Sequence, residues 1–200
     1  MNPKLLVIVL VALLVILAER WVGSARVHPP GILVPEAPTQ QPAGHSVFGF
    51  NDHVLTRRAK ISLCARVLST ERYWLDRGSR LSPVDLALGW GAMSDQAVLE
   101  RISVTQGGRW YFTRYELPAP VSDQDIILNS SNMHMIPSRP YVEKKLKKLR
   151  RGDLVELHGY LVDVDHASGW HWRTSLSRSD TGNGSCEIFY VEEIRVSDRF

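Results

Sequence analysis

The feature that most constrains this chain of 200 residues is an unbroken apolar run near its N-terminus. Leu5–Ala18 reads LLVIVLVALLVILA and contains no polar side chain. As a helix this run spans about 21 Å, less than the roughly 30 Å core of a bilayer. Trp21 and Val22 extend it past Glu19 and Arg20, and both Trp and Arg are tolerated at the lipid–water interface. A helix without a polar face suits a soluble surface poorly, so the run predicts a segment that enters a membrane.

Residues 1–25 allow three interpretations. They form an uncleaved signal-anchor, a signal peptide cut after Gly23-Ser24-Ala25, or a buried soluble helix, and we favour the anchor. Lys4 precedes the run whereas Arg20 and Arg26 follow it, so the charge bias that sets orientation is weak. The likeness of the run to the apolar region of a signal peptide favours an N-terminus inside and a domain outside. We therefore expect a single-pass protein of a bacterial inner membrane with its domain in the periplasm.

The charge balance argues against a dedicated DNA-binding protein. Lys and Arg number 24 against 21 Asp and Glu, which gives a formal net charge of +3. This surplus is far smaller than the one expected for a chain that lies along a nucleic-acid backbone.

The two cysteines, Cys64 and Cys186, are far apart in the sequence and have no CxxC spacing. In an oxidising compartment an even number of cysteines permits a disulfide, and a bridge closing so long a loop would contribute about 3–5 kcal/mol. The alternative is two unpaired thiols, at least one of them buried.

The chain beyond the leader divides into a linker and a domain. Residues 26–46 hold five prolines and almost no periodicity, which predicts an extended spacer. Residues 47–200 form the predicted globular β-rich domain.

We expect a mainly β (α+β) domain, a small OB-like barrel or sheet with two or three short helices. The order of a helix followed by GDLVELHGYLVDV is similar to the later half of an OB-type barrel, which is an analogy of fold alone. Alternation predicts strands over residues 60–69, 102–105, 109–115, 125–128, 154–164, 170–177 and 187–196. Capping residues predict short helices beginning at Ser82 and at Ser94-Asp95, and a helix over 141–151 that ends at Gly152. Glycines at 89 and 91 indicate a packing corner, and residues 129–140 are predicted to be a loop.

The segment WHWRTSLSRSDTGNGSCE, residues 170–187, is the most polar part of the predicted sheet. Strict alternation before SDTGNGS and an apolar run after it predict a hairpin, whose bend itself requires such residues. Because binding residues often flank turns, we select a set of candidates from this segment and from the 129–140 loop. The candidates are Asn132, His134, Arg173, Arg178 and Asp180.

A hydrolase is the alternative function, although an enzyme is the less favoured class. It would use Ser175 or Cys186 as nucleophile, His134 or His171 as base and Asp180 to orient the base. No GxSxG motif is present, and His171 lies about 13 Å from Ser175 along an extended strand, too far for a hydrogen bond.

The sequence predicts no cofactor and no metal site. It has neither an HExxH motif nor a glycine-rich phosphate loop before a helix, and the strand histidines His158 and His171 are the only pair that might converge. Nucleic-acid binding by an OB-like domain through Trp110, Tyr111 and Arg114 is a second, disfavoured alternative.

The predicted helix over 141–151 carries a dense basic face. Its residues are either a solvated surface or a patch that attracts anionic lipid headgroups or a protein partner. The patch consists of Lys144, Lys145, Lys147, Lys148, Arg150 and Arg151. Taken together, these features predict a membrane-tethered periplasmic binding or assembly module.

Overall fold

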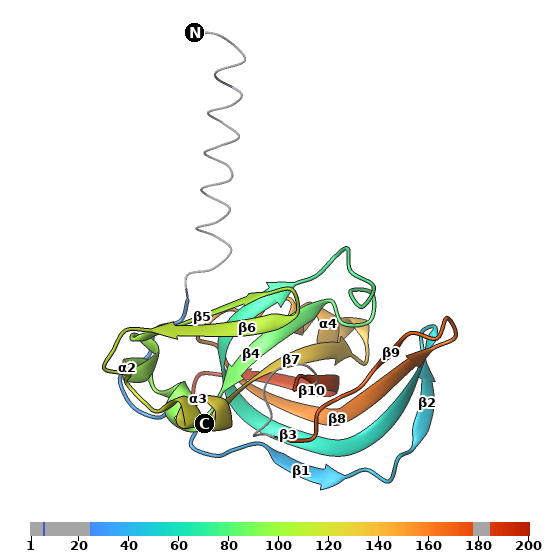
Figure 1. Ribbon diagram of the computed structural model, residues 1–200, viewed down its shortest axis with the longest axis horizontal. Helices are drawn as coiled ribbons and strands as arrows, with labels where there is room; N and C mark the ends of the chain where they lie inside the picture. Colours follow the sequence, from blue (N-terminus) through green and yellow to red (C-terminus); the bar gives the residue numbers. More distant parts are fainter. Residues whose placement is uncertain (1–5, 7–24, 178–184) are drawn as a thin grey trace.

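The computed structural model describes residues 6, 25–177 and 185–200 (Figure 1). The predictions made for Leu5–Ala18 therefore lie almost wholly outside the described residues. The strands are β1 Thr39–Pro42, β2 Val47–Phe50, β3 His53–Arg72, β4 Val84–Gly89, β5 Ile102–Gly107, β6 Trp110–Tyr115, β7 Ser130–Pro137, β8 Leu154–His166, β9 His171–Trp172 and β10 Glu187–Ser197. The helices are the 3-10 turn η1 Gly91–Ser94 and the α-helices α2 Gln96–Leu99, α3 Asp123–Leu128 and α4 Pro140–Leu146.

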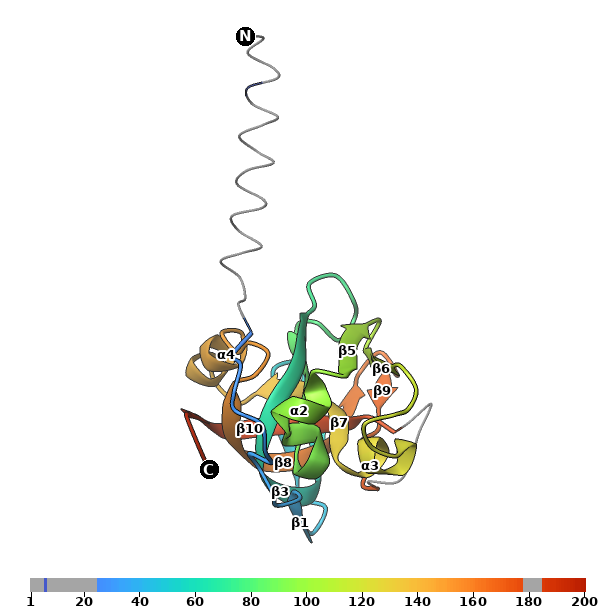
Figure 2. The same ribbon diagram turned by 90° about the vertical axis from the view of Figure 1, so that its left-hand side faces the viewer.

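The domain is mainly β, as predicted, and is built on a mixed eight-stranded sheet. The strand order is β1-β3-β4-β7-β10-β8-β9, with β2 on β3, and the pairing of β7 with β10 is parallel. The long strand β3 also pairs with β8 along its length, so β3, β4, β7, β10 and β8 pair in a ring. Figure 2 shows α4 on one side of this sheet and the separate β5–β6 hairpin, with α3, on the other.

The main core lies inside this ring of strands. Ile61, Leu63, Ala65 and Val67 of β3 face it, as their alternation predicted, together with Phe189 of β10. A second apolar cluster lies on the outer face of the sheet, where Trp170 and Trp172 pack against buried residues of β7, β8 and β10. The candidate site lies against this second cluster.

The prediction of a helix that begins at Ser82 is wrong, because residues 84–89 form the central strand β4. All six residues of β4 are buried, since the strand is paired on both edges and covered on both faces. A strand covered on both faces lacks the alternation of apolar and polar residues that identifies a strand. Without that alternation, Ser82 followed by Pro83 predicted the beginning of a helix. The second predicted helix is confirmed as α2, where Asp95 accepts a hydrogen bond from the backbone N–H of Ala97.

Residues 123–140 also differ from the prediction. The strand predicted over 125–128 is helix α3, capped reciprocally by Ser122 and Asp125. The loop predicted over 129–140 is strand β7, whose residues are all buried between β4 and β10. Its polar composition, SSNMHMIP, concealed a central strand because the polar side chains are buried beside partners inside the protein, such as Ser131 with Glu187 and Asn132 with Gln106.

The predicted spacer, residues 26–46, is part of the domain. Val34 is 1% exposed within the main core, and β1 pairs with β3 in antiparallel register. The helix predicted over 141–151 is confirmed but shorter, as α4. Within the described residues the strands predicted over 170–177 and 187–196 do not form a hairpin ladder, because β9 and β10 both pair with β8 rather than with each other.

The glycines at 89 and 91 do form a packing corner. Trp90 between them is 1% exposed, and its indole Nε1 donates a hydrogen bond to the carbonyl of Leu128. Gly91 has a φ of +49°, and a Cβ there would lie 2.1 Å from Oδ1 of Asn129. The corner therefore needs glycine, and it anchors β4 against α3.

Candidate functional site

Three chemically reactive side chains project from the outer face of the sheet. Asp85 of β4 and His134 of β7 are direct partners across an antiparallel pair. In the neighbouring strand Ile188 is the partner of His134, so Cys186, two residues earlier, shares the same face. The pleat of β4, β7 and β10 therefore places a carboxylate, an imidazole and a thiol in one row.

Asp85 is completely buried and has two neighbours, the guanidinium of Arg109 and the imidazole of His134. Its Oδ1 accepts a hydrogen bond of 2.7 Å from Nη1 of Arg109, and its Oδ2 lies 2.9 Å from Nδ1 of His134. Neither of these two atoms makes a hydrogen bond among the described residues, so their 2.9 Å contact is a close approach without hydrogen-bond geometry. The carboxylate therefore lies directly against the imidazole ring.

Arg109 reaches the site from the turn of the β5–β6 hairpin, which the sequence predicted. Gly108 and Arg109 take φ values of +60° and +72°, the left-handed pair typical of a tight two-residue turn. The guanidinium also makes a bidentate pair with Asp76, with two distances of 2.9 Å, and stacks 3.8 Å from the ring centroid of Tyr73. These contacts lock the hairpin over β4.

The electrostatics of this network keep Arg109 charged. Burial by itself lowers the pKa of the guanidinium, but the hydrogen bonds and charges of Asp76 and Asp85 outweigh it, so the pKa rises. Burial raises the pKa of the Tyr73 phenol, although its hydrogen bond to the backbone N–H of Arg109 opposes the shift.

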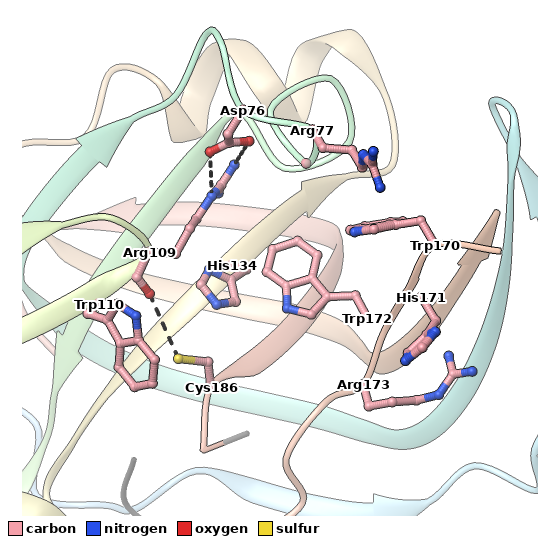
Figure 3. A pocket seen from close by; sticks show the side chains of 11 residues that line it. Asp76, Arg77, Arg109, Trp110, His134, Trp170, His171, Trp172, Arg173 and Cys186 are labelled. Atoms are coloured by element: carbon pink, nitrogen blue, oxygen red, sulfur yellow. Dashed lines mark hydrogen bonds and ion pairs between the residues drawn. The ribbon is translucent and has the colours of Figure 1, made fainter. Parts of the chain in front are cut away.

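A pocket of about 560 Å³ opens in front of this row. Its lining combines tryptophans, basic side chains and the thiol, which come from five separate segments of the chain (Figure 3). The lining residues are Asp76, Arg77, Gly78, Arg109, Trp110, His134, Trp170, His171, Trp172, Arg173 and Cys186.

Tryptophans form the apolar wall of the pocket. Trp172 lies against the imidazole of His134, with ring centroids 4.4 Å apart, and Trp170 packs 5.9 Å from Trp172. Trp110, more than one-third exposed, faces them from the hairpin. The rim is basic: Arg77 is exposed and makes no ion pair within the described residues, and Arg173 pairs with Asp165.

Two of the five predicted binding residues line the pocket, namely His134 and Arg173. Asn132 is buried beside it, where its amide donates to the carbonyl of Arg109 and accepts from Gln106. Arg178 and Asp180 lie outside the described residues. The sequence did not indicate Asp85, because a helix was predicted to begin at Ser82. It did not indicate Arg109 either, because that residue was predicted to begin a strand rather than to lie in the turn.

The two candidate nucleophiles, Cys186 and Ser175, lie in different surroundings. Cys186 lines the pocket, and its Sγ lies 3.9 Å from the carbonyl oxygen of Arg109. Ser175 is buried, its hydroxyl donating to the carbonyl of Ser177, and it is not among the lining residues. Cys64 and Cys186 both keep their thiol groups, so the disulfide considered from the sequence is not formed in this structure.

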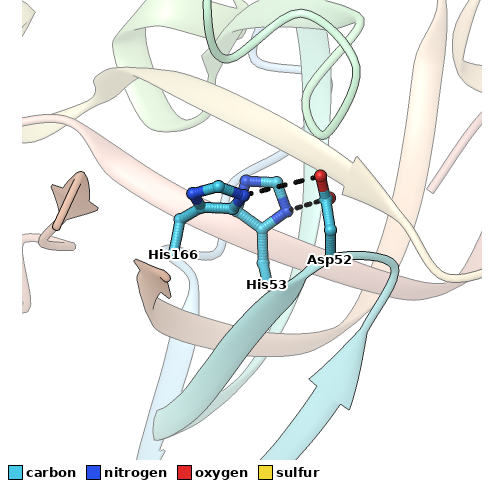
Figure 4. Close-up of side chains that lie close together, drawn as sticks. All are labelled: Asp52, His53 and His166. Carbon is cyan, nitrogen blue, oxygen red and sulfur yellow. Dashed lines mark ion pairs between the residues drawn. The ribbon is translucent and has the colours of Figure 1, made fainter. Parts of the chain in front are cut away.

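A separate cluster can hold a divalent cation. His53 and His166 are cross-strand partners of β3 and β8, and Asp52 lies 2.8 Å from Nδ1 of His53 and 3.6 Å from Nε2 of His166 (Figure 4). Imidazole and carboxylate donors suit zinc and related ions. No local motif revealed the cluster, because pairing of distant strands assembles it.

The remaining candidates lie outside the pocket. His158, expected to converge with His171, instead contacts Ser62 and Glu156 on an exposed part of the sheet.

In the predicted basic patch Lys144, Lys148 and Arg151 are exposed, while the other cations of the patch are half-buried. The described residues contain no helix of the length and apolarity that a membrane crossing requires.

Comparison of this chain with protein-family models, with curated proteins and with solved structures finds no match. The function is therefore argued from the pocket alone.

Proposed function

We propose that this protein is a membrane-tethered periplasmic domain that binds a compact anionic ligand with a flat apolar part. The observation that carries the proposal is the pocket itself, where Trp110, Trp170 and Trp172 surround a cavity whose rim bears Arg77 and Arg173. Indole faces bind flat apolar groups, and guanidinium groups bind carboxylate or phosphate. Arg77 makes no ion pair among the described residues, whereas Arg173 also pairs with Asp165. Since the tryptophans gather in a pocket rather than along an open face, a small ligand is favoured over a polymer.

The arrangement of strands supports an OB-like fold for this domain. The ring strands follow the order β3, β4, β7, then helix α4, then β8 and β10. OB-type domains bind ligands on the face of their second and third strands, between the loops that follow the first and fourth. The corresponding features here are β4 and β7, Asp76–Gly78 after β3, and Trp170–Arg173 after β8, all at the pocket.

Ligand binding can be tested with 1-naphthalenesulfonate, which combines a flat ring system with one negative charge. We expect saturable binding by the full-length protein in zwitterionic nanodiscs, measured by calorimetry with empty nanodiscs subtracted. Trp172→Ala removes one indole wall and should weaken binding about tenfold, since an aromatic stacking contact contributes roughly 1–3 kcal/mol. Trp74→Ala is the matched control, because Trp74 is 72% exposed and does not line the pocket. Equal affinities of the Trp172→Ala and Trp74→Ala proteins would contradict the proposed site.

The apolar run Leu5–Ala18 is the proposed membrane tether. The exposed cations of the basic patch would add attraction to anionic lipid headgroups. We expect alkaline phosphatase fused after Phe200 to be active in bacterial cells, because that enzyme needs the oxidising periplasm to fold. The same fusion without residues 1–25 should be inactive. An inactive full-length fusion, with an active cytoplasmic reporter at the same position, would reverse the orientation.

A further inference from the structure

We propose that Cys186 is a nucleophile in this pocket, that His134 is its general base and that Asp85 positions His134, for acyl transfer from an ester that carries an anionic group. This inference rests on the proposed ligand pocket and adds a reaction to it. The sequence offered Cys186 and His134 only as separate alternatives, with Asp180 as the third member.

The strand register brings the three side chains together. Asp85 and His134 face each other directly, and continuing the β7–β10 ladder by one residue places Cys186 diagonally beside His134. At the usual strand spacing and rise, such diagonal Cα atoms lie about 8 Å apart. Two side chains that project from the same face can close this separation, and Figure 3 shows both at the same wall of the pocket.

The imidazole is held in the orientation that a base requires. His134 is 2% exposed, its Nδ1 faces the buried carboxylate of Asp85, and Trp172 covers one face of the ring. Its other nitrogen, Nε2, has no hydrogen-bond partner among the described residues and turns to the side of the pocket where Cys186 lies. With Nδ1 protonated toward Asp85, Nε2 is the acceptor that can take the thiol proton.

The reaction balances with an ester and water alone. Nε2 of His134 takes the proton of the Cys186 thiol, and the sulfur attacks the carbonyl carbon, forming a carbon–sulfur bond. The carbon–oxygen bond to the leaving group breaks, and His134 returns the proton to the departing oxygen. Water, or another hydroxyl compound, then attacks the thioester carbonyl, which restores the thiol and releases the acyl group.

The surroundings of the thiol select the substrate class. Arg77 and Arg173 at the rim favour a substrate with a negative charge, and the indoles favour a flat or apolar group beside it. Asp76 and Asp85 both pair with Arg109, so this one guanidinium offsets one of their two negative charges. His171 also faces the pocket and adds no negative charge.

Cys64 provides an internal control for the reactivity of Cys186. Both side chains are partly exposed, but Cys64 lies on β3 outside the pocket. Burial and then the charge of Glu156 raise the pKa of the Cys64 thiol, whereas Cys186 lies beside a histidine. The thiolate is the reacting form, so the two cysteines should titrate differently.

Alkylation by iodoacetamide tests the base. In the full-length protein, peptide mass spectrometry follows both cysteines as a function of pH. We expect the midpoint for Cys186 to lie at least about one pH unit below that for Cys64. His134→Gln should abolish this difference, while the alkylation profile of Cys64 stays unchanged. Identical profiles for the two cysteines in the wild-type protein would overturn the inference without any variant.

An acyl-transfer probe tests the reaction itself. 4-Acetoxybenzenesulfonate carries an acetyl ester, a flat ring and a sulfonate. We expect one equivalent of 4-hydroxybenzenesulfonate to be released rapidly, with one acetyl group on the peptide that contains Cys186. Cys186→Ala should lose the burst, and Cys64→Ala should keep both the burst and 1-naphthalenesulfonate binding. Binding of the sulfonate without acetylation of Cys186 would leave the pocket standing and reject the nucleophile, whereas loss of binding in the wild-type protein would reject the pocket.

Discussion

Replacing Asp85 by alanine lowers the free energy of unfolding of this protein by about 3–5 kcal/mol. Asp85 is 0% exposed, and its two oxygens face the guanidinium of Arg109 and the imidazole of His134. Removing the carboxylate leaves a positive guanidinium in a partly buried site with only Asp76 as its ionic partner. The cost is the desolvation of a partly buried guanidinium that has lost its buried carboxylate, which is larger than the net contribution of the pair.

Urea unfolding of the full-length protein in a mild detergent, followed by circular dichroism, measures this effect. The matched control is Asp165→Ala, which removes an exposed ion pair with Arg173 and should cost less than about 1 kcal/mol. Arg109→Met in the Asp85→Ala background should recover part of the loss, because the unpaired charge is then absent. Similar losses for Asp85→Ala and Asp165→Ala would show that Asp85 does not hold the network together.

Trp90→Ala is expected to lower the free energy of unfolding by about 3–5 kcal/mol as well, but for an apolar reason. The indole is 1% exposed within the main core, and its Nε1 donates to the carbonyl of Leu128. Alanine leaves a cavity where β4 turns into η1, and that strand carries Asp85. We therefore expect Trp90→Ala also to weaken 1-naphthalenesulfonate binding.

A graded series separates packing from hydrogen bonding at this position. Trp90→Phe keeps most of the buried ring and loses the N–H donor, so its cost should be about 1–3 kcal/mol. Trp74→Ala removes a 72% exposed indole and should leave the urea midpoint unchanged. A Trp90→Ala protein as stable as the Trp74→Ala protein would contradict the role assigned to the corner.

The candidate site was predicted in part. His134, Cys186 and Arg173 were selected from sequence because histidine, thiol and arginine stand near turn-forming residues, and all three line the pocket. Asp85 was missed because VDLALG lies in a central strand, where burial on both faces removes the period of two. Asn132 was selected as a ligand-binding residue, yet its amide bridges Arg109 and Gln106 beneath the hairpin.

The sequence by itself determined the local features of this protein. Alternation predicted most of β3, β5, β6, β8 and β10, and the glycines at 107 and 108 predicted a turn between β5 and β6, one residue before the turn that the structure has. The tertiary structure alone decided which strands are neighbours and therefore which side chains meet. Asp85, His134 and Cys186 are far apart along the chain, and only the pairing of β4 with β7 and of β7 with β10 puts them in one row. The physical reason is that strand pairing is set by the burial of whole faces, whereas a sequence pattern reports only the faces of one strand at a time.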